Sequence, residues 1–449
     1  MNFNTDKIPT SQCKKYYNIV CAIENYSADN IDTVNGGFNA IGTGTYNGWN
    51  QVNNYYESSF EEIKITNSVL PLKTFVQYYE LSELPNDCRY LYIINIHNVV
   101  YFENNINIGF KKISQKVLED IKNNKAKLVL LMSTEGESGT IMAPQDFNIL
   151  NDWINDLQLP AKNIHYINGN LTSNTISKQN TMPYNMYGVT VFETWNDPFK
   201  FNDIVDFKPA ENQYLYLNYN RIPRLHRIYL LAELLEAGLF NEGLNSFDIT
   251  KNITLLQDNN FKYAINMYDK ELLQTAQYIF NTKTQIIDID TTNNLASNIN
   301  IHMHESTFVD IVTETIVDPN SLFISEKLWK PIMIGKPFIV LGSNGMLSKL
   351  KEMGYKTYDK WFDETYDNTN TLNEKIKIII KNINSYKDKS IDELRYIRKQ
   401  MSETCKYNQL HFKTLVKDKY YDKEFRIVGS SSSATKPVLD ILNSIYNNW

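Results

Sequence analysis

The sequence predicts an α/β protein with two domains. The chain has 449 residues, more than one ordinary hydrophobic core holds. Its 42% hydrophobic and 21% charged residues are the balance of a globular protein and not of a disordered or fibrous one. Predicted strands and helices alternate in both halves, and a stretch without periodicity separates the halves. We therefore expect two Rossmann-like domains, each built on a parallel sheet.

Charge, cysteine usage and hydropathy narrow the classes of function. The net charge of -6 argues against a surface built throughout for nucleic acid, because that affinity comes mostly from neutralised phosphates. The cysteines lie singly, without a CxxC pair, which fits a reducing compartment. The sequence shows neither a secretory signal peptide nor a run of about 18 apolar residues. We expect a cytoplasmic protein without a membrane span. Abundant Asn, Ile, Lys and Tyr are typical of an AT-rich coding sequence, so the aromatic residues are no argument for sugar stacking.

The first half alternates strands and helices from residue 90 onward. Before that point glycines break any long period, so residues 1–80 predict only short strands and loops. The predicted elements are residues 91–102 (strand), 113–124 (amphipathic helix), 127–133 (buried strand), 143–160 (helix ended by Pro160) and 162–169 (strand).

The second half begins after residues 196–212, which lose periodicity and contain two prolines. We divide the chain into residues 1–205, 206–385 and a C-terminal helical segment, 386–449. The predicted elements of the second domain are residues 213–220 (strand), 221–239 (loop and helix ended by Gly238), 308–316 (strand), 325–335 (short helix), 336–343 (strand) and 346–354 (helix).

Three arginines follow the strand 213–220 and open the next helix: Arg221, Arg224 and Arg227. Pro223 suits the first position of that helix. Arg224 and Arg227 are three residues apart and would project from one helical face. Ligands of an open α/β sheet bind beyond the carboxyl ends of the strands, where a helix N-terminus and forked guanidiniums favour a diphosphate.

The alternative is that these arginines form surface ion pairs with Glu233 or Glu236. We favour phosphate binding, because three arginines cluster at the loop where such sheets bind ligands. His226, within the same cluster, either bonds a phosphate oxygen or packs against the helix.

Residues 313–343, TETIVDPNSLFISEKLWKPIMIGKPFIVLGS, are the most informative segment. Ser325 suits a helix N-cap, so Glu326 and Lys327 fall in the first turn and face the ligand crevice. The apolar residues that follow supply a buried helix face. Pro331 should shorten or kink this helix.

The run FISEKLWKPIMIGKPFIVLG resembles the donor-site signature of the α1,3-fucosyltransferases and related enzymes with the GT-B fold. In that family an acidic strand end precedes a Thr-Glu-Lys-Leu-Trp helix and an aliphatic strand. The resemblance implies two Rossmann-like domains facing each other across a cleft. Residues 1–205 would bind the acceptor and residues 206–385 the donor, with residues 386–449 packing back across the cleft.

The same resemblance implies roles for single residues. Glu326 would bind the donor ribose, Lys327 the diphosphate, and Glu314 the nucleotide or sugar. Thr315 stands where the family has Asn, and Pro331 interrupts the helix. Both departures bear on the identity of the sugar more than on the fold.

Sugar transfer to a hydroxyl needs a general base that removes the proton during attack on the anomeric carbon. Glu135 and Glu137 follow the buried strand 127–133, where a parallel sheet would present them to the crevice. His97, in the strand 91–102, is the other candidate, although a lone strand histidine is more often packed. We favour Glu135.

Two patterns could indicate a metal. Asp288-Ile289-Asp290 matches a DxD metal motif but lies among Asn and Thr, so we interpret it as a loop. His302 and His304 would share one face of a strand, but zinc needs a third ligand that the sequence does not indicate. We expect the arginines and Lys327 to stabilise the departing diphosphate without a metal.

These observations predict a glycosyltransferase that moves a sugar from a UDP- or GDP-sugar to a hydroxyl of a glycan, a protein or a modified DNA base. The net charge does not favour the DNA acceptor. The alternative is a non-catalytic nucleotide-binding or assembly protein with Rossmann-like domains. A kinase or nuclease is disfavoured, since no P-loop, kinase Gly-rich loop or carboxylate metal cluster occurs.

Overall fold

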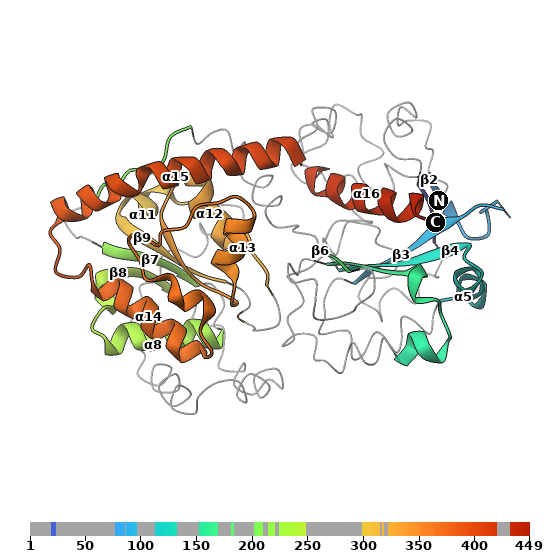
Figure 1. Cartoon of the computed structure of the whole chain (residues 1–449), viewed down its shortest axis with the longest axis horizontal. Coiled ribbons are helices and arrows are strands. Elements are labelled where there is room, and N and C mark those ends of the chain that lie inside the picture. Colours follow the sequence, from blue (N-terminus) through green and yellow to red (C-terminus); the bar gives the residue numbers. More distant parts are fainter. Residues whose placement is uncertain are drawn as a thin grey trace. The chain divides into compact units, whose positions relative to one another are not determined.

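A computed structural model describes the structure of the chain (Figure 1). The described residues are 19–23, 77–85, 87–96, 113–132, 152–168, 181–183, 202–209, 214–220, 224–247, 299–314, 317, 322–419 and 432–449. The chain divides into two compact units. Unit 1 combines Met1–Glu193 with Asp418–Trp449, and unit 2 is Thr194–Lys417. The predicted helical segment 386–449 is therefore shared between the two units.

Both units are α/β with a parallel sheet, which confirms that part of the predicted fold class and is compatible with two Rossmann-like domains. The sheet of unit 1 has the order β2-β1-β3-β4-β5-β6, and that of unit 2 the order β10-β9-β7-β8. The strands are β1 (Val20–Ile23), β2 (Gln77–Glu80), β3 (Tyr90–Ile96), β4 (Ala126–Met132), β5 (Ile164–Asn168), β6 (Thr181–Pro183), β7 (Tyr214–Asn220), β8 (Gly243–Phe247), β9 (Thr307–Thr313) and β10 (Phe338–Leu341).

Helices accompany both sheets. They are α5 (Gln115–Lys122), α8 (Leu225–Glu236), α11 (Ile301–Glu305), α12 (Glu326–Ile334), α13 (Met346–Glu352), α14 (Leu372–Asn384), α15 (Ile391–Lys419) and α16 (Ser432–Asn447), with 3-10 turns η6 (Ala161–Asn163), η8 (Phe240–Glu242) and η10 (Glu364–Asn368). Residues 152–156, within the predicted helix 143–160, are also helical. Among the described helices, none is long and apolar enough to cross a bilayer.

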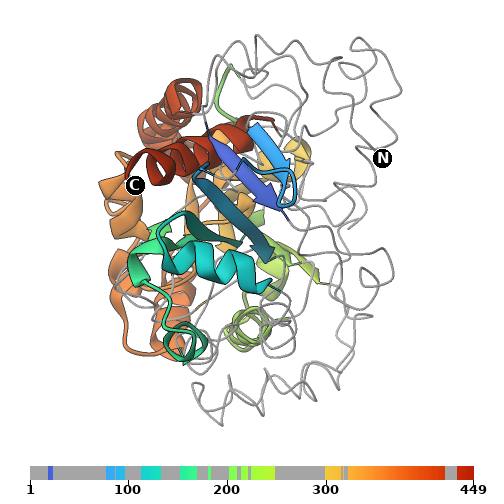
Figure 2. The ribbon, with the colours of Figure 1, turned by 90° about the vertical axis from the view of Figure 1, so that its right-hand side faces the viewer.

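In unit 1, α5 packs across one face of the six-stranded sheet (Figure 2). The Ser114 side chain caps the helix by accepting from the Val117 backbone N–H at 3.3 Å. Val117 and Ile121, one turn apart, are fully buried against Tyr90 and Leu128. Strand side chains alternate between the two faces of the sheet, so one set of strand residues forms this core with α5.

The C-terminal end of α16 is anchored to unit 1 by Lys127, whose side chain is almost fully buried. Its Nζ donates to the Ile445 carbonyl at 2.7 Å and thereby satisfies the end of the helix. The same Nζ lies 4.7 Å from the centre of the Trp449 ring, and the Arg89 guanidinium lies 5.6 Å from it. The Trp449 indole N–H donates to the Asn124 carbonyl at 2.6 Å. Residues 445–449 therefore pack against residues of unit 1 that lie more than 300 positions earlier in the sequence.

We expect Trp449→Ala to destabilise unit 1 by about 2 kcal/mol, because it removes two cation–π contacts and a hydrogen bond. Hydrogen exchange of the peptide that contains β4 would report this loss within unit 1. The exposed Tyr396 of α15 offers a control, and Tyr396→Ala should leave β4 protection unchanged. Equal protection of β4 in wild type and Trp449→Ala would contradict the anchoring role.

Unit 2 is layered, with α8 and α14 side by side on one face of its sheet and α12 and α15 on the other (Figure 1). On the latter face, the Trp329 ring of α12 stacks on Phe412 of α15, with centroids 5.6 Å apart. Gln409 donates to the Met333 carbonyl at 2.9 Å across the same pair. Every residue of β9 is buried, as expected of a strand covered on both faces.

Glycines in the left-handed conformation follow the C-terminal ends of α8 and α12. Gly238, with φ +63°, follows α8, and its N–H donates to the Leu235 carbonyl at 3.0 Å, which confirms the prediction for this residue. Gly335, with φ +68°, ends α12 after nine residues that include Pro331. A Cβ at Gly335 would lie 2.4 Å from Ile204 Cγ2, so only glycine fits there.

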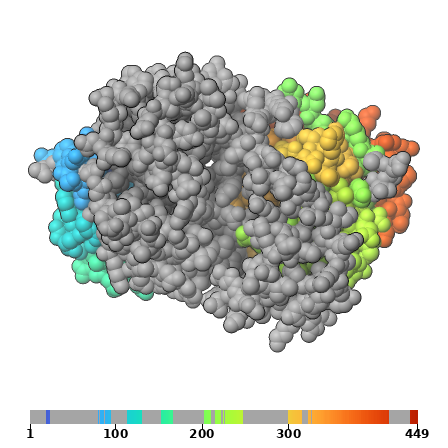
Figure 3. All heavy atoms as spheres, turned by 180° about the vertical axis from the view of Figure 1, so that it is seen from behind, coloured from blue at the N-terminus to red at the C-terminus, as the bar shows by residue number. Residues whose placement is uncertain are grey.

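The predicted strand with two histidines on one face is wrong, because His302 and His304 lie in the helix α11. Residues two apart on a helix point in different directions. The His302 side chain is accordingly 93% exposed and that of His304 only 3%. The helix lies at the surface on the face of the molecule seen in Figure 3, where it is gold. The two histidines therefore cannot bind one metal ion.

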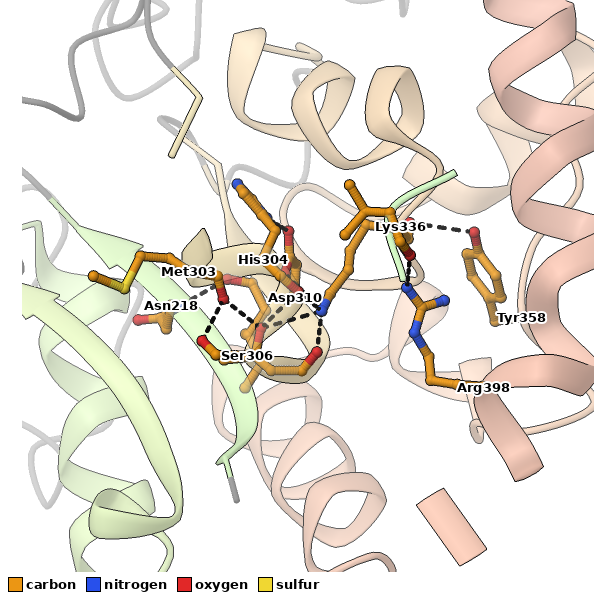
Figure 4. A network of polar contacts seen from close by, with 11 residues as sticks. Asn218, Met303, His304, Ser306, Asp310, Lys336, Tyr358 and Arg398 are labelled. Carbon is orange, nitrogen blue, oxygen red and sulfur yellow. Dashed lines mark hydrogen bonds and ion pairs between the residues drawn. The ribbon is translucent and has the colours of Figure 1, made fainter. Parts of the chain in front are cut away.

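A buried lysine, Lys336, connects α11 to β9 and β10 at the edge of the unit 2 sheet where these parallel strands begin, the amino edge (Figure 4). Lys336 is fully buried, and its Nζ donates to the His304 and Thr307 carbonyls. It also lies 3.9 Å from Asp310 Oδ1. The other oxygen of Asp310 accepts from His304 Nδ1 at 2.7 Å. Burial lowers the pKa of Lys336 to about 7 despite the nearby Asp310 carboxylate, which acts to raise it.

We expect Lys336→Met to reduce the free energy of unfolding of unit 2 by about 3–5 kcal/mol, because Asp310 would lose its buried cation and two carbonyls would lose their donor. The difference in free energy of unfolding between the wild type and Lys336→Met should grow as the pH rises. Since the folded pKa of about 7 lies below the ordinary 10.5, the unfolded chain binds more protons between these values. The wild type therefore gains stability from Lys336 as the pH rises through that window, and the Met variant does not.

Urea unfolding at pH 7 and at about pH 9 would measure this difference. Lys349→Met is the matched control, because Lys349 is a partly exposed lysine paired with Glu352 on α13. A Lys336→Met deficit that shrinks at the higher pH would contradict the assignment.

Candidate functional site

The carboxyl ends of β7, β9 and β10 and the N-termini of α8 and α12 meet around Glu314. Because the strands are parallel, their carboxyl ends lie on one edge of the sheet, where α/β proteins bind ligands. Glu314 directly follows β9, and its backbone N–H donates to the Leu341 carbonyl at the end of β10, at 2.9 Å. This edge is therefore the candidate site.

At the N-terminus of α8, Arg224 is the N-cap, with extended backbone angles of φ -116° and ψ 153°. The first helical residue is Leu225 and not Pro223, so that prediction is wrong. Arg224 is partly exposed, whereas Arg227 is 2% exposed and directed into the protein. The two arginines therefore do not share one ligand-facing helical face as predicted.

Arg227 and His226 bind the backbone that follows β9. Arg227 Nη2 donates to the Glu314 carbonyl at 3.2 Å, and His226 Nε2 donates to the same oxygen at 2.8 Å. Because a carbonyl only accepts, Nε2 carries the imidazole proton. His226 is buried, so of its two predicted roles the structure has the packed one.

The first turns of α8 and α12, which carry Arg224 and Lys327, are both hydrogen-bonded to Glu314. Burial lowers the pKa of His226 well below its ordinary value. The positive charges of Arg227, Arg224 and Lys327 lower it further, while the bond to Glu314 opposes them. Arg224 and Lys327 come from different helices, yet each acts on this imidazole. The first turn of α8, with Arg224 and Arg227, and the turn at Ser325 thus meet at Glu314.

At the N-terminus of α12, Ser325 is the N-cap, as predicted. Its hydroxyl accepts from the Lys327 backbone N–H at 3.2 Å and from Lys327 Nζ at 3.4 Å. The Ser325 backbone N–H donates to Glu314 Oε1 at 3.0 Å. Ser325 and Glu314 are fully buried, and Lys327 is partly exposed. Glu326 is the first residue of the helix, and its side chain lies outside the described part.

A buried polar cluster that the sequence patterns did not predict lies beneath this edge. Asn220 donates to Asn218 along β7 and accepts from the Thr313 hydroxyl of β9. Its backbone N–H donates to the Ser246 hydroxyl of β8 at 3.2 Å. The only local signal is the run NYN at the end of an apolar strand. Because each buried amide needs a partner, the cluster fixes the alignment of three strands at the candidate site.

Lys375 of α14 was also missed. Its buried Nζ donates to the Gly342 carbonyl, just after β10, at 2.8 Å. Burial lowers the pKa of this lysine to about 8. A Cβ at Gly342 would lie 3.3 Å from Glu314 Cγ and 2.7 Å from Met346 Cε, so the glycine makes room for the Glu314 side chain.

Several predicted residues lie outside the described residues. These are Arg221, the candidate bases Glu135, Glu137 and His97, and the pair Asp288 and Asp290. Their roles stay predictions. Within the ranges that the structure does describe, no group of three or more His, Cys, Asp or Glu residues is placed to hold a metal ion.

We expect Ser325→Ala to cost about 1 kcal/mol, because the first turn of α12 loses its side-chain cap. The change should appear in urea unfolding of unit 2 and as faster hydrogen exchange at the start of α12. Ser402→Ala, which removes a hydroxyl bonded within α15, should change the free energy of unfolding by less than about 0.5 kcal/mol. A silent Ser325→Ala would show that the cap contributes nothing.

Comparison with protein-family models, with curated proteins and with solved structures finds no match to this chain.

Proposed function

We propose that this chain is a nucleotide-sugar-dependent glycosyltransferase of the GT-B type. The observation that carries the proposal is the convergence of two helix N-termini, each with a partly exposed cation, at the carboxyl edge of a parallel sheet. Arg224 and Lys327 are these cations. The resemblance of FISEKLWKPIMIGKPFIVLG to the donor-site signature adds to it.

The physical match is to a diphosphate. The N-terminus of a helix carries a partial positive charge, which favours an anion. An arginine adds a planar fork of donors for phosphate oxygens, and a lysine adds a mobile point charge. A UDP- or GDP-sugar presents a diphosphate between nucleoside and sugar, so it places its charge where these groups meet.

The proposed reaction uses this charge in the transition state. The acceptor hydroxyl oxygen attacks the anomeric carbon while the bond from that carbon to the diphosphate oxygen breaks. The hydroxyl proton passes to a general base, for which Glu135 is the predicted residue. Negative charge grows on the departing diphosphate, and Arg224 and Lys327 would stabilise it there.

In this proposal unit 2 binds the donor and unit 1 binds the acceptor, as in the two domains of a GT-B enzyme. A glycan, a protein or a modified DNA base would supply the hydroxyl. A cytoplasmic location is part of the same proposal. The alternative, a non-catalytic nucleotide-binding or assembly protein, shares the diphosphate site but transfers no sugar.

We expect UDP or GDP to bind the wild type, and Lys327→Ala to weaken that binding by about 10- to 100-fold, because a charged hydrogen bond to the phosphate is lost. Isothermal titration calorimetry would measure both. Lys208→Ala is the matched control, since this exposed lysine pairs with Glu305 near the opposite edge of the same sheet. The affinity of Lys208→Ala for UDP and GDP should equal that of the wild type.

If the wild type bound neither UDP, GDP nor a UDP- or GDP-sugar, the proposal would be wrong. Binding without transfer of radiolabelled sugar to any component of a cell extract would instead favour the non-catalytic alternative.

A further inference from the structure

We infer that Glu314 is a positioning residue, which holds the first turns of α8 and α12 in register for the diphosphate, and that it does not contact the ligand. The inference rests on the proposed function and changes the role that the family resemblance implies for this residue. Its basis is that three separate elements are fastened to Glu314 by hydrogen bonds, while the residue itself is fully buried.

The N-cap of α12 needs an acceptor from outside the helix. In a capping box, the third helical residue is Glu or Gln, and its side chain accepts from the N-cap backbone N–H. In α12 the third helical residue is Leu328, which has no acceptor. The Glu314 carboxylate supplies one instead, at 3.0 Å from the Ser325 nitrogen. Glu314 thus takes the role of the missing capping-box glutamate from a neighbouring strand.

The backbone of Glu314 fastens the other two elements. Its carbonyl accepts from His226 and Arg227 of α8, and its N–H donates to Leu341 at the end of β10. The side chain thus fixes one cation-bearing helix and the carbonyl fixes the other. A displacement of Glu314 would change the separation of Arg224 and Lys327, which the two ends of one diphosphate must bridge.

Reach and charge can be separated by two substitutions. Glu314→Gln keeps an oxygen at the same distance from Ser325 and removes the negative charge. Glu314→Asp keeps the charge and withdraws it by one methylene, beyond hydrogen-bond distance. A positioning residue depends on reach, so Gln should behave like the wild type and Asp like Ala. A residue that binds ribose or sugar through its charge should lose function in Gln as well.

The first measurement is hydrogen exchange, by mass spectrometry, of the ligand-free protein. We expect residues 322–334 to exchange about tenfold faster in Glu314→Asp and Glu314→Ala and close to the wild-type rate in Glu314→Gln, because only the first two lose the bond to Ser325. Residues 113–132 of unit 1 should not change in any variant. Glu305→Ala, a carboxylate lost near the opposite edge, is the matched control.

The second measurement is calorimetry with UDP and GDP. We expect affinity to fall about tenfold in Glu314→Asp and to stay within about threefold of the wild type in Glu314→Gln. If Glu314→Gln lost nucleotide binding while residues 322–334 still exchanged at the wild-type rate, the inference would be overturned. Glu314 would then be a ligand contact. Normal exchange at 322–334 in Asp would overturn the inference too.

The two measurements fail separately. If the wild type binds no nucleotide, the proposed function fails, and the exchange data still decide whether Glu314 fixes α12. If Glu314→Ala does not fold, the comparison of Gln with Asp carries the test alone.

Discussion

The hydrogen bonds of Glu314 are the constraint on which the candidate site depends. Without these bonds, the ends of α8, α12 and β10 would not be held at fixed positions relative to one another at the carboxyl edge of the sheet. One carbonyl that accepts from His226 and Arg227, and one carboxylate that accepts from Ser325, remove that freedom. The bond from the Ser325 N–H offsets part of the cost of burying the carboxylate. The site is therefore built around a buried glutamate, with Arg224 and Lys327 partly exposed beyond it.

The two edges of the unit 2 sheet use charge differently. At the amino edge Lys336 is fully buried, and its donors go to carbonyls of α11 and β9. At the carboxyl edge Arg224 and Lys327 keep part of their surface in solvent. A lysine enclosed in this way can only hold the fold together, because no ligand reaches it. Arg224 and Lys327, at the two helix N-termini, are partly exposed, as the proposed binding of an anion requires.

Local patterns predicted the elements that carry their own signal. The apolar runs of β4, β7, β9 and β10 and the cap at Ser325 were found because neighbouring residues decide them. The strand β8 was missed, since its buried polar Asn245 finds a hydrogen-bond partner in the Tyr216 hydroxyl of β7, 29 residues earlier. The helix α11 was taken for a strand. The carbonyl of His304, near its end, accepts from Lys336, 32 residues later, and no local pattern contains that contact. The burial of Glu314 likewise follows from the Ser325 N–H eleven residues later, which no window around Glu314 contains.

The return of Asp418–Trp449 to unit 1 has a consequence for biosynthesis. Domains generally fold in the order in which they leave the ribosome, the first one first. Here all of Thr194–Lys417 emerges before the tryptophan and helix that complete the earlier unit. The nascent chain must therefore carry an N-terminal sheet that lacks the packing of α16 and Trp449 while the later unit assembles. Slow translation or a chaperone acting over that interval would matter more for this protein than for one whose two domains follow each other in sequence.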